Sequence, residues 1–335
     1  MDGKTETTGS PVRPERPFVV TGIGEVLWDL LPAGRRLGGA PANFACHVAR
    51  LGVESYLVSA VGDDALGKEA HRVLAVSGVS TRHLAVLSTV PTGTVGVQLS
   101  PAGIPRYQIV EKVAWDLIRC DEAETRLASR VDAACFGTLA QRAPNSRAAI
   151  RHFLALTPPG CLRILDINLR GNYFDGDLIR SSLELTNILK LNNEELPIVC
   201  RLLGGPDGED AGLAFLLRNF GLRLVALTKG AAGCRIITPD QDVQVPGVPV
   251  ARIADTVGAG DSFTAMLAIG LLARWPLTLI AERANRLAAF VCSQPGGMPV
   301  IPENVLQTIW NAKPEPSLYS VPAGWTHQSE CGVPP

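Results

Sequence analysis

Two aspartates near the end of this 335-residue chain enclose a run of small residues. Asp255 and Asp261 flank a Gly-Ala-Gly turn at 258–260, and the apolar stretch 262–273 that follows predicts a helix. Small residues let the backbone approach a ligand, and free N–H groups at a helix start favour an anion. A carboxylate beside an anion site indicates proton transfer, so the pattern suggests phosphoryl transfer to a hydroxyl, with Asp261 taking the proton. The simpler alternative is a capped helix start with a tight glycine turn.

A second glycine turn, Gly38-Gly39-Ala40-Pro41-Ala42-Asn43, also leads into a predicted helix. Asn43 would lie in the first helical turn, where its amide can reach a ligand hydroxyl while the glycines allow close contact. The alternative is an ordinary loop with proline near the helix start and Asn43 facing solvent.

Three polar segments each follow a predicted strand, where parallel sheets bind their ligands. In the segment 166–170, Arg170 could clamp a phosphate. Asn192 and Glu195 could hold a hydrated Mg²⁺, and the turn 228–233 offers a threonine hydroxyl and glycine amides to nucleotide phosphates. Each segment also has a simpler interpretation, respectively an exposed Asn/Asp turn, a solvated helix start and a β-turn.

Other chemistries are disfavoured by the sequence. Gly22-Ile23-Gly24 lacks the third glycine of a dinucleotide fingerprint because residue 27 is leucine, and no phosphate-binding P-loop motif occurs. The net charge of −1 without a basic block argues against nucleic acid and membrane. Eight cysteines without a Cys-x-x-Cys pair, and an N-terminus without a signal-peptide core, favour the cytoplasm.

The elements that would position these residues alternate between strand and helix. Strands are expected at 18–24, 56–61, 133–137, 163–167, 188–191 and 224–228, and helices at 42–51, 65–77, 146–157, 177–185 and 212–219. This alternation predicts an α/β fold with a mostly parallel sheet and helices on both faces.

Two segments break the alternation. Residues 92–99 and 106–111 flank a turn signal and predict a β-hairpin that, together with 27–37, forms a small separate sheet and a candidate lid. A second antiparallel pair is expected within 234–245.

The order of these motifs over residues 18–310 resembles the ribokinase/PfkB family of carbohydrate kinases. Within that family, Gly24-Glu25, Ala114-Trp115-Asp116 and Gly137-Thr138-Leu139 look most like the fructokinase branch. The resemblance implies a ribokinase-like three-layer α/β/α fold with a small β-sheet lid. It places the kinase domain at 18–313, after a disordered lead at 1–17 and before a proline-rich tail at 314–335.

The resemblance also implies a role for each matching residue. Asp261 matches the catalytic base, Gly258, Ala259 and Gly260 the anion hole, and Arg170 an arginine near the phosphate or sugar. Asp29, Gly39 and Asn43 match the sugar contacts, Thr228, Gly230 and Gly233 the nucleotide turn, and Asn285 the adenine pocket. Asn192 and Glu195 match the pair that organises Mg²⁺ through water, and Asp255 and Gly296 resemble the parts that hold a monovalent cation such as K⁺ in some members.

The implied activity is ATP-dependent phosphorylation of a primary hydroxyl on a small sugar, with fructose as first candidate. Ribose, 2-keto-3-deoxygluconate, a nucleoside and a sugar phosphate are alternative acceptors, chosen by pocket residues such as Gln98, Tyr107 and Gln141. A non-catalytic sugar sensor is a further alternative, although such a protein would not need Asp261. A homodimer through the lid is also expected, with Val95, Val97, Leu99 and Ile109 as the packing residues.

Overall fold

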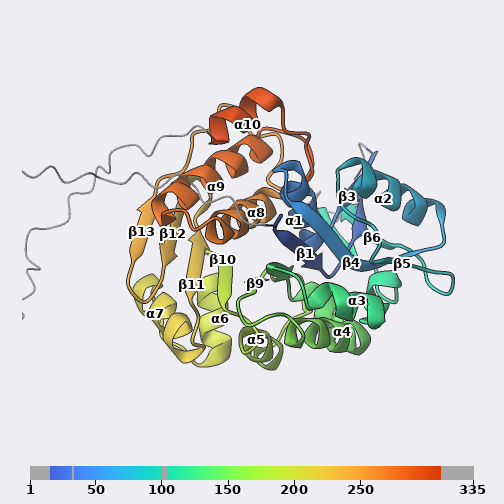
Figure 1. Cartoon of the computed structure of the whole chain (residues 1–335), viewed down its shortest axis with the longest axis horizontal. Helices are drawn as coiled ribbons and strands as arrows, with labels where there is room; N and C mark the ends of the chain where they lie inside the picture. The colour runs from blue at the N-terminus through green and yellow to red at the C-terminus, as the bar shows by residue number, and fades with distance from the viewer. Residues whose placement is uncertain (1–15, 32–33, 100–104, 311–335) are drawn as a thin grey trace, which may run out of the picture.

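A computed structural model of the chain describes residues 16–31, 34–99 and 105–310, with the backbone alone at 97–99 and 105–107. Its centre is a nine-stranded sheet in the order β13-β12-β11-β10-β9-β8-β1-β4-β5 (Figure 1). Seven strands run parallel: β1 (Val19–Ile23), β4 (Glu54–Gly62), β5 (Leu84–Leu87), β8 (Ala133–Phe136), β9 (Leu162–Asp166), β10 (Ile188–Asn192) and β11 (Leu224–Thr228). The predicted antiparallel pair, β12 (Cys234–Ile237) and β13 (Asp242–Val245), closes one edge.

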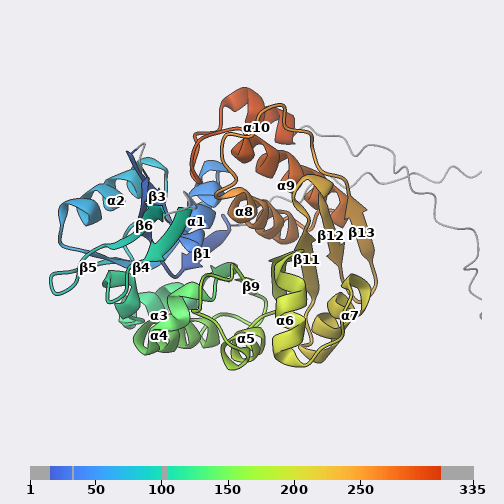
Figure 2. The same cartoon turned by 180° about the vertical axis from the view of Figure 1, so that it is seen from behind.

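Helices cover both faces of this sheet, as Figures 1 and 2 show from opposite sides. One layer holds α1 (Ala40–Arg50), α2 (Ala65–Val76), α8 (Ala259–Leu272), α9 (Leu277–Cys292) and α10 (Glu303–Trp310). The other layer holds α3 (Glu122–Ala128), α4 (Pro144–Ala155), α5 (Gly176–Leu183), α6 (Glu195–Leu203) and α7 (Glu209–Asn219). The described residues also form three short 3₁₀ turns, η1 (Ala114–Leu117), η2 (Leu139–Arg142) and η3 (Gly230–Ala232).

The apolar core explains why the parallel strands read as continuous hydrophobic runs. Successive side chains of a strand point to opposite faces, and here both faces are covered. In β1, Val19 and Ile23 belong to the cluster under α3–α7, whereas Val20 belongs to the cluster under α8 and α9. The predicted three-layer α/β/α architecture is therefore confirmed.

The predicted lid is a separate four-stranded sheet in the order β3-β2-β6-β7. Its strands are β2 (Leu27–Leu31), β3 (Gly34–Gly38), β6 (Gly93–Leu99) and β7 (Pro105–Ile109). The hairpin turn at 100–104 and residues 32–33 lie outside the described residues. Because only residues 24–26 separate β1 from β2, the lid begins at the carboxyl end of β1. Lid residues therefore line the same cleft as the loops that follow β9, β10 and β11.

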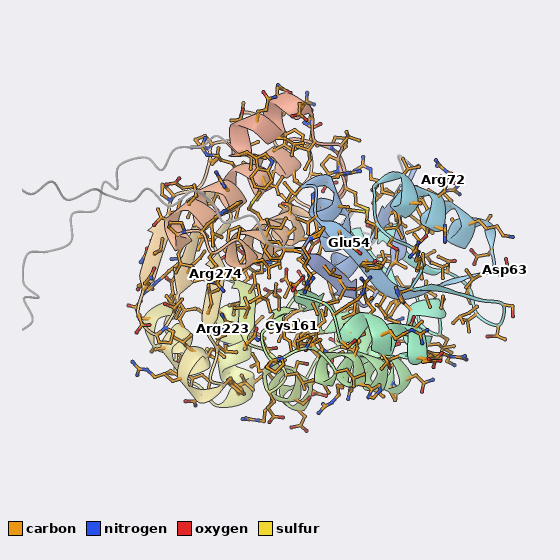
Figure 3. The ribbon with its side chains drawn as sticks, in the orientation of Figure 1. Glu54, Asp63, Arg72, Cys161, Arg223 and Arg274 are labelled. Atoms are coloured by element: carbon orange, nitrogen blue, oxygen red, sulfur yellow. The ribbon has the colours of Figure 1, made fainter. Side chains whose placement is uncertain are left out.

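The sequence analysis did not predict β5, α3, α9, α10 or the three 3₁₀ turns, and it anticipated only the start of α6. The boundaries at 17 and 313 stay predictions, since 1–15 and 311–335 lie outside the described residues. Charged side chains such as Asp63 and Arg72 lie on the outside of the molecule (Figure 3), and Arg223 is exposed as well. Within the described ranges, no helix combines the length and apolar character needed to cross a bilayer.

Candidate active site

A cleft of about 2190 Å³ opens at the carboxyl ends of the parallel strands, beneath the lid. The structure brings most of the sequence-predicted site residues into its wall. Those lining it are Asp29, Gly39, Asn43, Arg170, Asn192, Thr228, Gly230, Gly233, Asp255, Gly258, Ala259, Gly260, Asp261, Asn285 and Gly296. In open α/β sheets, ligands bind outside the carboxyl ends of the strands. A crevice forms there where the loops of two neighbouring strands lead to helices on opposite faces of the sheet.

The predicted anion hole is the start of α8. Gly258 caps this helix with a left-handed φ of 78°, and a Cβ there would come within 2.5 Å of the Gly297 backbone. Both the conformation and the close packing therefore require glycine. The first amides of a helix have no acceptor within it, and the positive end of this helix dipole lies at the cleft, which residues 258–261 line. The Ala259 amide makes one long contact, to the Thr256 carbonyl at 3.4 Å.

Asp261 lies in the first turn of α8, with 7% of its surface exposed. Its Oδ2 accepts a 2.7 Å hydrogen bond from Nδ2 of Asn43, in the first turn of α1. Burial, followed by the nearby charge of Asp166, raises the pKa of Asp261 to about 6, while the Asn43 hydrogen bond and the charges of Lys190 and Arg170 lower it. A carboxyl with this pKa is ionised at neutral pH yet accepts a proton more readily than an exposed aspartate does.

If Asp261 is the base that the sequence predicts, we expect kcat/KM to fall as the pH drops through about 6, because the base must be unprotonated and burial raises the pKa of Asp261 to about 6. Asn43→Ala should move this acid limb to higher pH, since it removes a hydrogen bond that lowers the pKa. Initial rates of ADP release across the pH range measure both. If the acid limb of Asn43→Ala lies at the same pH as that of the wild type, the limb reports the titration of another carboxyl.

A buried ion pair lies beneath the predicted anion hole at the start of α8. Lys190 on β10 and Asp166 on β9 face each other in register, with Nζ 3.0 Å from Oδ1 and both side chains 4% exposed. Thr264 donates to the other oxygen of Asp166 at 2.8 Å. A Cβ on Gly260 would come within 2.7 Å of the Lys190 Nζ, so the ammonium group lies directly beneath the first turn of α8.

The charge state of this pair follows from its surroundings. Burial lowers the pKa of Lys190, but the carboxylates of Asp166, Glu195 and Asp261 outweigh it and hold the pKa above the usual value. Lys190 is therefore a fixed positive charge in the floor of the cleft.

The lid side of the cleft carries two further carboxyls. Asp29 lies on β2, and burial, followed by the charge of Asp255, raises its pKa to about 6. Glu25 accepts from the amide of Ala40 at 3.2 Å through Oε1, and its Oε2 is buried without a partner in the structure. Burial raises the pKa of Glu25 to about 7. This corner can therefore both donate and accept hydrogen bonds, as hydroxyl recognition requires.

Gly39 joins this corner to α1. It is the residue before the helix, with φ 104°, and a Cβ there would lie 2.4 Å from the Glu25 carbonyl oxygen. Its conformation and the close contact explain why the predicted sugar-facing turn carries glycine at this position.

Arg170 is exposed on the loop after β9 and lines the cleft. Its guanidinium donates to the carbonyl of Leu169 at 3.0 Å, and its charge lowers the pKa of both Asp261 and Asp29. Asn168 turns the chain with a left-handed φ of 44°, a conformation that asparagine tolerates. The positive charge of Arg170 thus acts on both Asp29 and Asp261, the two carboxylates predicted to contact the sugar.

The residues predicted to bind the nucleotide line the part of the cleft next to β11 and α9. Thr228 ends β11, and Gly230 and Gly233 bound the η3 turn that follows it. Asn285 donates to the carbonyl of Pro246 at 3.0 Å. Apolar side chains, Val248, Ile253 and Ala288 among them, line the wall beyond. An apolar wall with a few placed polar groups is typical of cofactor pockets.

Asn192 and Glu195 are arranged to brace two loops. The Asn192 side chain accepts from the amides of Glu194 and Glu195 at 2.8 and 2.9 Å. The two Glu195 oxygens accept from the amides of Leu169 and Asn192 at 3.0 and 2.9 Å. Asn192 lines the cleft, whereas Glu195 lies buried behind it. The Mg²⁺ role predicted for this pair stays a prediction, because the Glu195 carboxylate already accepts from two backbone amides and does not line the cleft.

Both carboxylate oxygens of Asp255 already accept hydrogen bonds from the protein. Its Oδ2 accepts from Nη1 of Arg36 at 3.0 Å and from the amide of Gly296 at 3.1 Å, and its Oδ1 accepts from the amide of Val257 at 3.1 Å. In the described part of the chain, no group of three or more His, Cys, Asp or Glu side chains could hold a metal ion.

Of the three side chains predicted to select the acceptor, the structure describes only that of Gln141. Gln141 does not line the cleft: it is 1% exposed and donates to the Gly137 carbonyl and to Ser182, so its predicted role is corrected to a structural one. Gln98 and Tyr107 lie in β6 and β7, but their side chains are outside the described residues.

Sequence reasoning gave no site role to Glu25, Lys190 or Arg36. For the first two, a signal existed. A charged residue inside or directly after an apolar strand run, as in Ile188-Leu189-Lys190-Leu191, must be paired when buried. Arg36 carried no such signal, because an arginine on a lid strand is ordinarily a surface residue.

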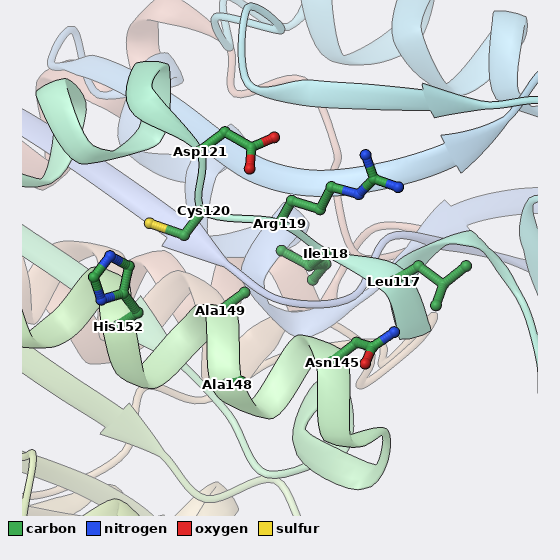
Figure 4. A pocket seen from close by; sticks show the side chains of 9 residues that line it. All are labelled: Leu117, Ile118, Arg119, Cys120, Asp121, Asn145, Ala148, Ala149 and His152. Atoms are coloured by element: carbon green, nitrogen blue, oxygen red, sulfur yellow. The ribbon is translucent and has the colours of Figure 1, made fainter.

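A smaller hollow of about 450 Å³ lies between α4 and residues 117–121 (Figure 4), and none of its lining residues lines the large cleft. Arg119, Cys120 and Asp121 line one side, and Asn145 and His152 the other. Their side chains do not converge on one point, so the hollow has no arrangement suited to chemistry (Figure 4).

The fold and the cleft define a ribokinase-like sugar kinase that uses ATP. The model of the pfkB family carbohydrate kinases matches residues 33–304, and the chain belongs to that family. A fructokinase of Klebsiella pneumoniae is 30% identical, with 84% of this chain and 95% of that protein covered.

Solved structures agree with this assignment. A sugar kinase of Pyrococcus horikoshii in complex with ATP is 28% identical with a TM-score of 0.70, covering 84% of this chain and 94% of that one. A double mutant of the Vibrio cholerae fructokinase, with bound fructose, ADP and potassium ion, shares the fold at 24% identity and a TM-score of 0.76, covering 89% and 99%.

Proposed function

We propose that this sugar kinase transfers the γ-phosphoryl group of ATP to a primary hydroxyl of fructose, with Asp261 as general base. The observation that carries the proposal is the position of Asp261, whose carboxylate is held by Asn43 in the helix turn that also presents the anion-binding amides. A base and an anion site in one helical turn can serve the attacking hydroxyl and the transferred phosphoryl group together.

In the proposed reaction, the hydroxyl oxygen forms a bond to the γ-phosphorus while its proton passes to Asp261. The bond between the γ-phosphorus and the bridging oxygen breaks, and ADP leaves with that electron pair. The amides of Gly258, Ala259 and Gly260, with the Arg170 guanidinium, stabilise the charge that spreads over the phosphoryl oxygens. Bound with ATP, Mg²⁺ would neutralise part of the triphosphate charge.

Sugar binding is assigned to the lid side of the cleft. Asp29, Asn43 and the Gly39 turn supply acceptors, donors and close backbone contact for the hydroxyls. Nucleotide binding is assigned to Thr228, Gly230, Gly233 and Asn285. The lid over this end excludes water, which would otherwise compete as the phosphoryl acceptor.

Fructose is supported by the 30% identical fructokinase, and an ADP-release assay over a panel of acceptors tests it. We expect the highest kcat/KM with fructose, ahead of ribose, 2-keto-3-deoxygluconate and a nucleoside. Each good hydrogen bond to a hydroxyl discriminates strongly against an acceptor that lacks it, so the preferred sugar should stand out clearly. A higher kcat/KM for any other acceptor would replace fructose in the proposal.

The expected homodimer has less support than the activity. Val95 is 7% exposed and Ile109 is partly buried against the main core, so both side chains offer a partner less surface than the prediction assumed. Val97 and Leu99 have no described side chains. Leu30 on β2, with 41% exposure, is an apolar lid residue open to a partner, and the dimer stays a prediction.

A further inference from the structure

An arginine from the lid reaches the loop that leads into the anion hole. Arg36 lies on β3, in register with Asp29 on β2, and its Nη1 is 3.0 Å from Oδ2 of Asp255. Its aliphatic stem packs on Gly296, where a Cβ would come within 3.2 Å of the Arg36 Cδ. The guanidinium therefore lies between the lid, the 255–260 loop and the 296–297 loop.

The donors around Asp255 leave little room for a metal ion. Its two oxygens already accept from one guanidinium and two backbone amides. A carboxylate offers about four lone-pair positions, so these three N–H groups use most of them. A cation placed here would also meet the positive charge of Arg36 instead of the oxygen ligands that hard cations take.

Stability alone does not account for this ion pair. Arg36 is 38% exposed and Asp255 20%, and pairs this open to water contribute little to folding. The consequence of the pair is instead a positive charge fixed beside the loop that carries Gly258, Ala259 and Gly260.

We propose that the Arg36 guanidinium takes the place at Asp255 of the monovalent cation that the family resemblance implies, so that this kinase works without K⁺. Because Arg36 belongs to the lid, the charge is in place only when the lid lies against the 255–260 loop. The inference rests on the proposed kinase reaction at this site.

The test compares K⁺ with tetramethylammonium at a constant ionic strength of about 0.1 M, which keeps general screening equal. Wild-type kcat should differ by less than about fivefold, the lower end of typical activator coupling. Arg36→Met should be slower without K⁺ and should regain activity by about fivefold or more when K⁺ is added. Its melting temperature should also rise with K⁺, as ion binding to the folded state predicts, while that of the wild type should not.

Arg35→Met is the matched control, since Arg35 is the neighbouring lid arginine but pairs with Glu69 and stacks on Trp28. It should keep the wild-type response to K⁺. Activation of the wild type by K⁺ of fivefold or more would overturn the inference. So would an Arg36→Met enzyme as active as the wild type without K⁺. A wild type whose rate of ADP release is the same with and without every sugar of the panel would instead reject the proposed function, and the melting temperatures would still test the cation.

Discussion

Asp261→Asn is expected to lose about 10²–10⁴ in kcat while retaining the fold and sugar binding. Asparagine has the size of aspartate, and its amide oxygen can still accept the hydrogen bond from Asn43. It cannot take the proton of the attacking hydroxyl. The acid limb near pH 6 should disappear from the residual activity, because the group assigned to it is gone.

The stability of this variant separates a catalytic role from a structural one. Burial raises the pKa of Asp261 above its unfolded value, so its contribution to stability is present at low pH and is lost as the pH rises through about 6. At pH 8, Asp261→Asn should therefore melt no lower than the wild type. Asp63→Asn, the same change at an exposed surface site, is the control and should leave turnover unchanged. Wild-type turnover in Asp261→Asn would reject the proposed base.

Lys190→Met is expected to lower the free energy of unfolding by about 3–5 kcal/mol. Methionine replaces the stem of the side chain but leaves the Asp166 carboxylate buried without its cation. Urea unfolding with linear extrapolation measures the loss. If the protein still folds, the acid limb of kcat/KM should move above pH 6, since Lys190 lowers the pKa of Asp261.

The double variant Lys190→Met/Asp166→Asn distinguishes an uncompensated charge from lost packing. Asparagine removes the charge and keeps an acceptor for Thr264, so the double variant should be more stable than Lys190→Met alone. Lys68→Met removes an exposed lysine paired with Asp63 and should have little effect on stability. A double variant no more stable than the single one would show that packing, not charge, decides the loss.

Local patterns identified most of the fold. The strand and helix periods predicted six of the parallel-sheet strands, the antiparallel pair within 234–245 and the lid hairpin. Two of the missed elements are short, since β5 has four residues and α3 has seven. The placement of such short elements depends on packing against neighbours that a single chain segment does not reveal. The α9 sequence does carry a helical signal, because its buried residues recur at 280, 284, 287 and 291, so this helix was predictable from the sequence.

By itself, the sequence determined which residue types are available for binding and proton transfer in the cleft. The glycines at 39 and 258 require backbone conformations that other residues resist, and Asn43, Arg170 and Asp261 sit at the ends of predictable elements. Such signals are local, because they depend on a few neighbouring residues. Gln141 shows the limit, since its position near a strand end was readable but its orientation into the core was not.

Only the tertiary structure decided which side chains meet across long separations. Asn43 and Asp261 are 218 residues apart, and Arg36 and Asp255 are 219 apart. Lys190 faces Asp166 because β9 and β10 pair in one register, which no spacing along the chain specifies. Residue types and periods fix what each element can be, but burial and charge pairing arise only when distant elements pack. That packing sets the pKa of Asp261 and places the Arg36 guanidinium beside Asp255.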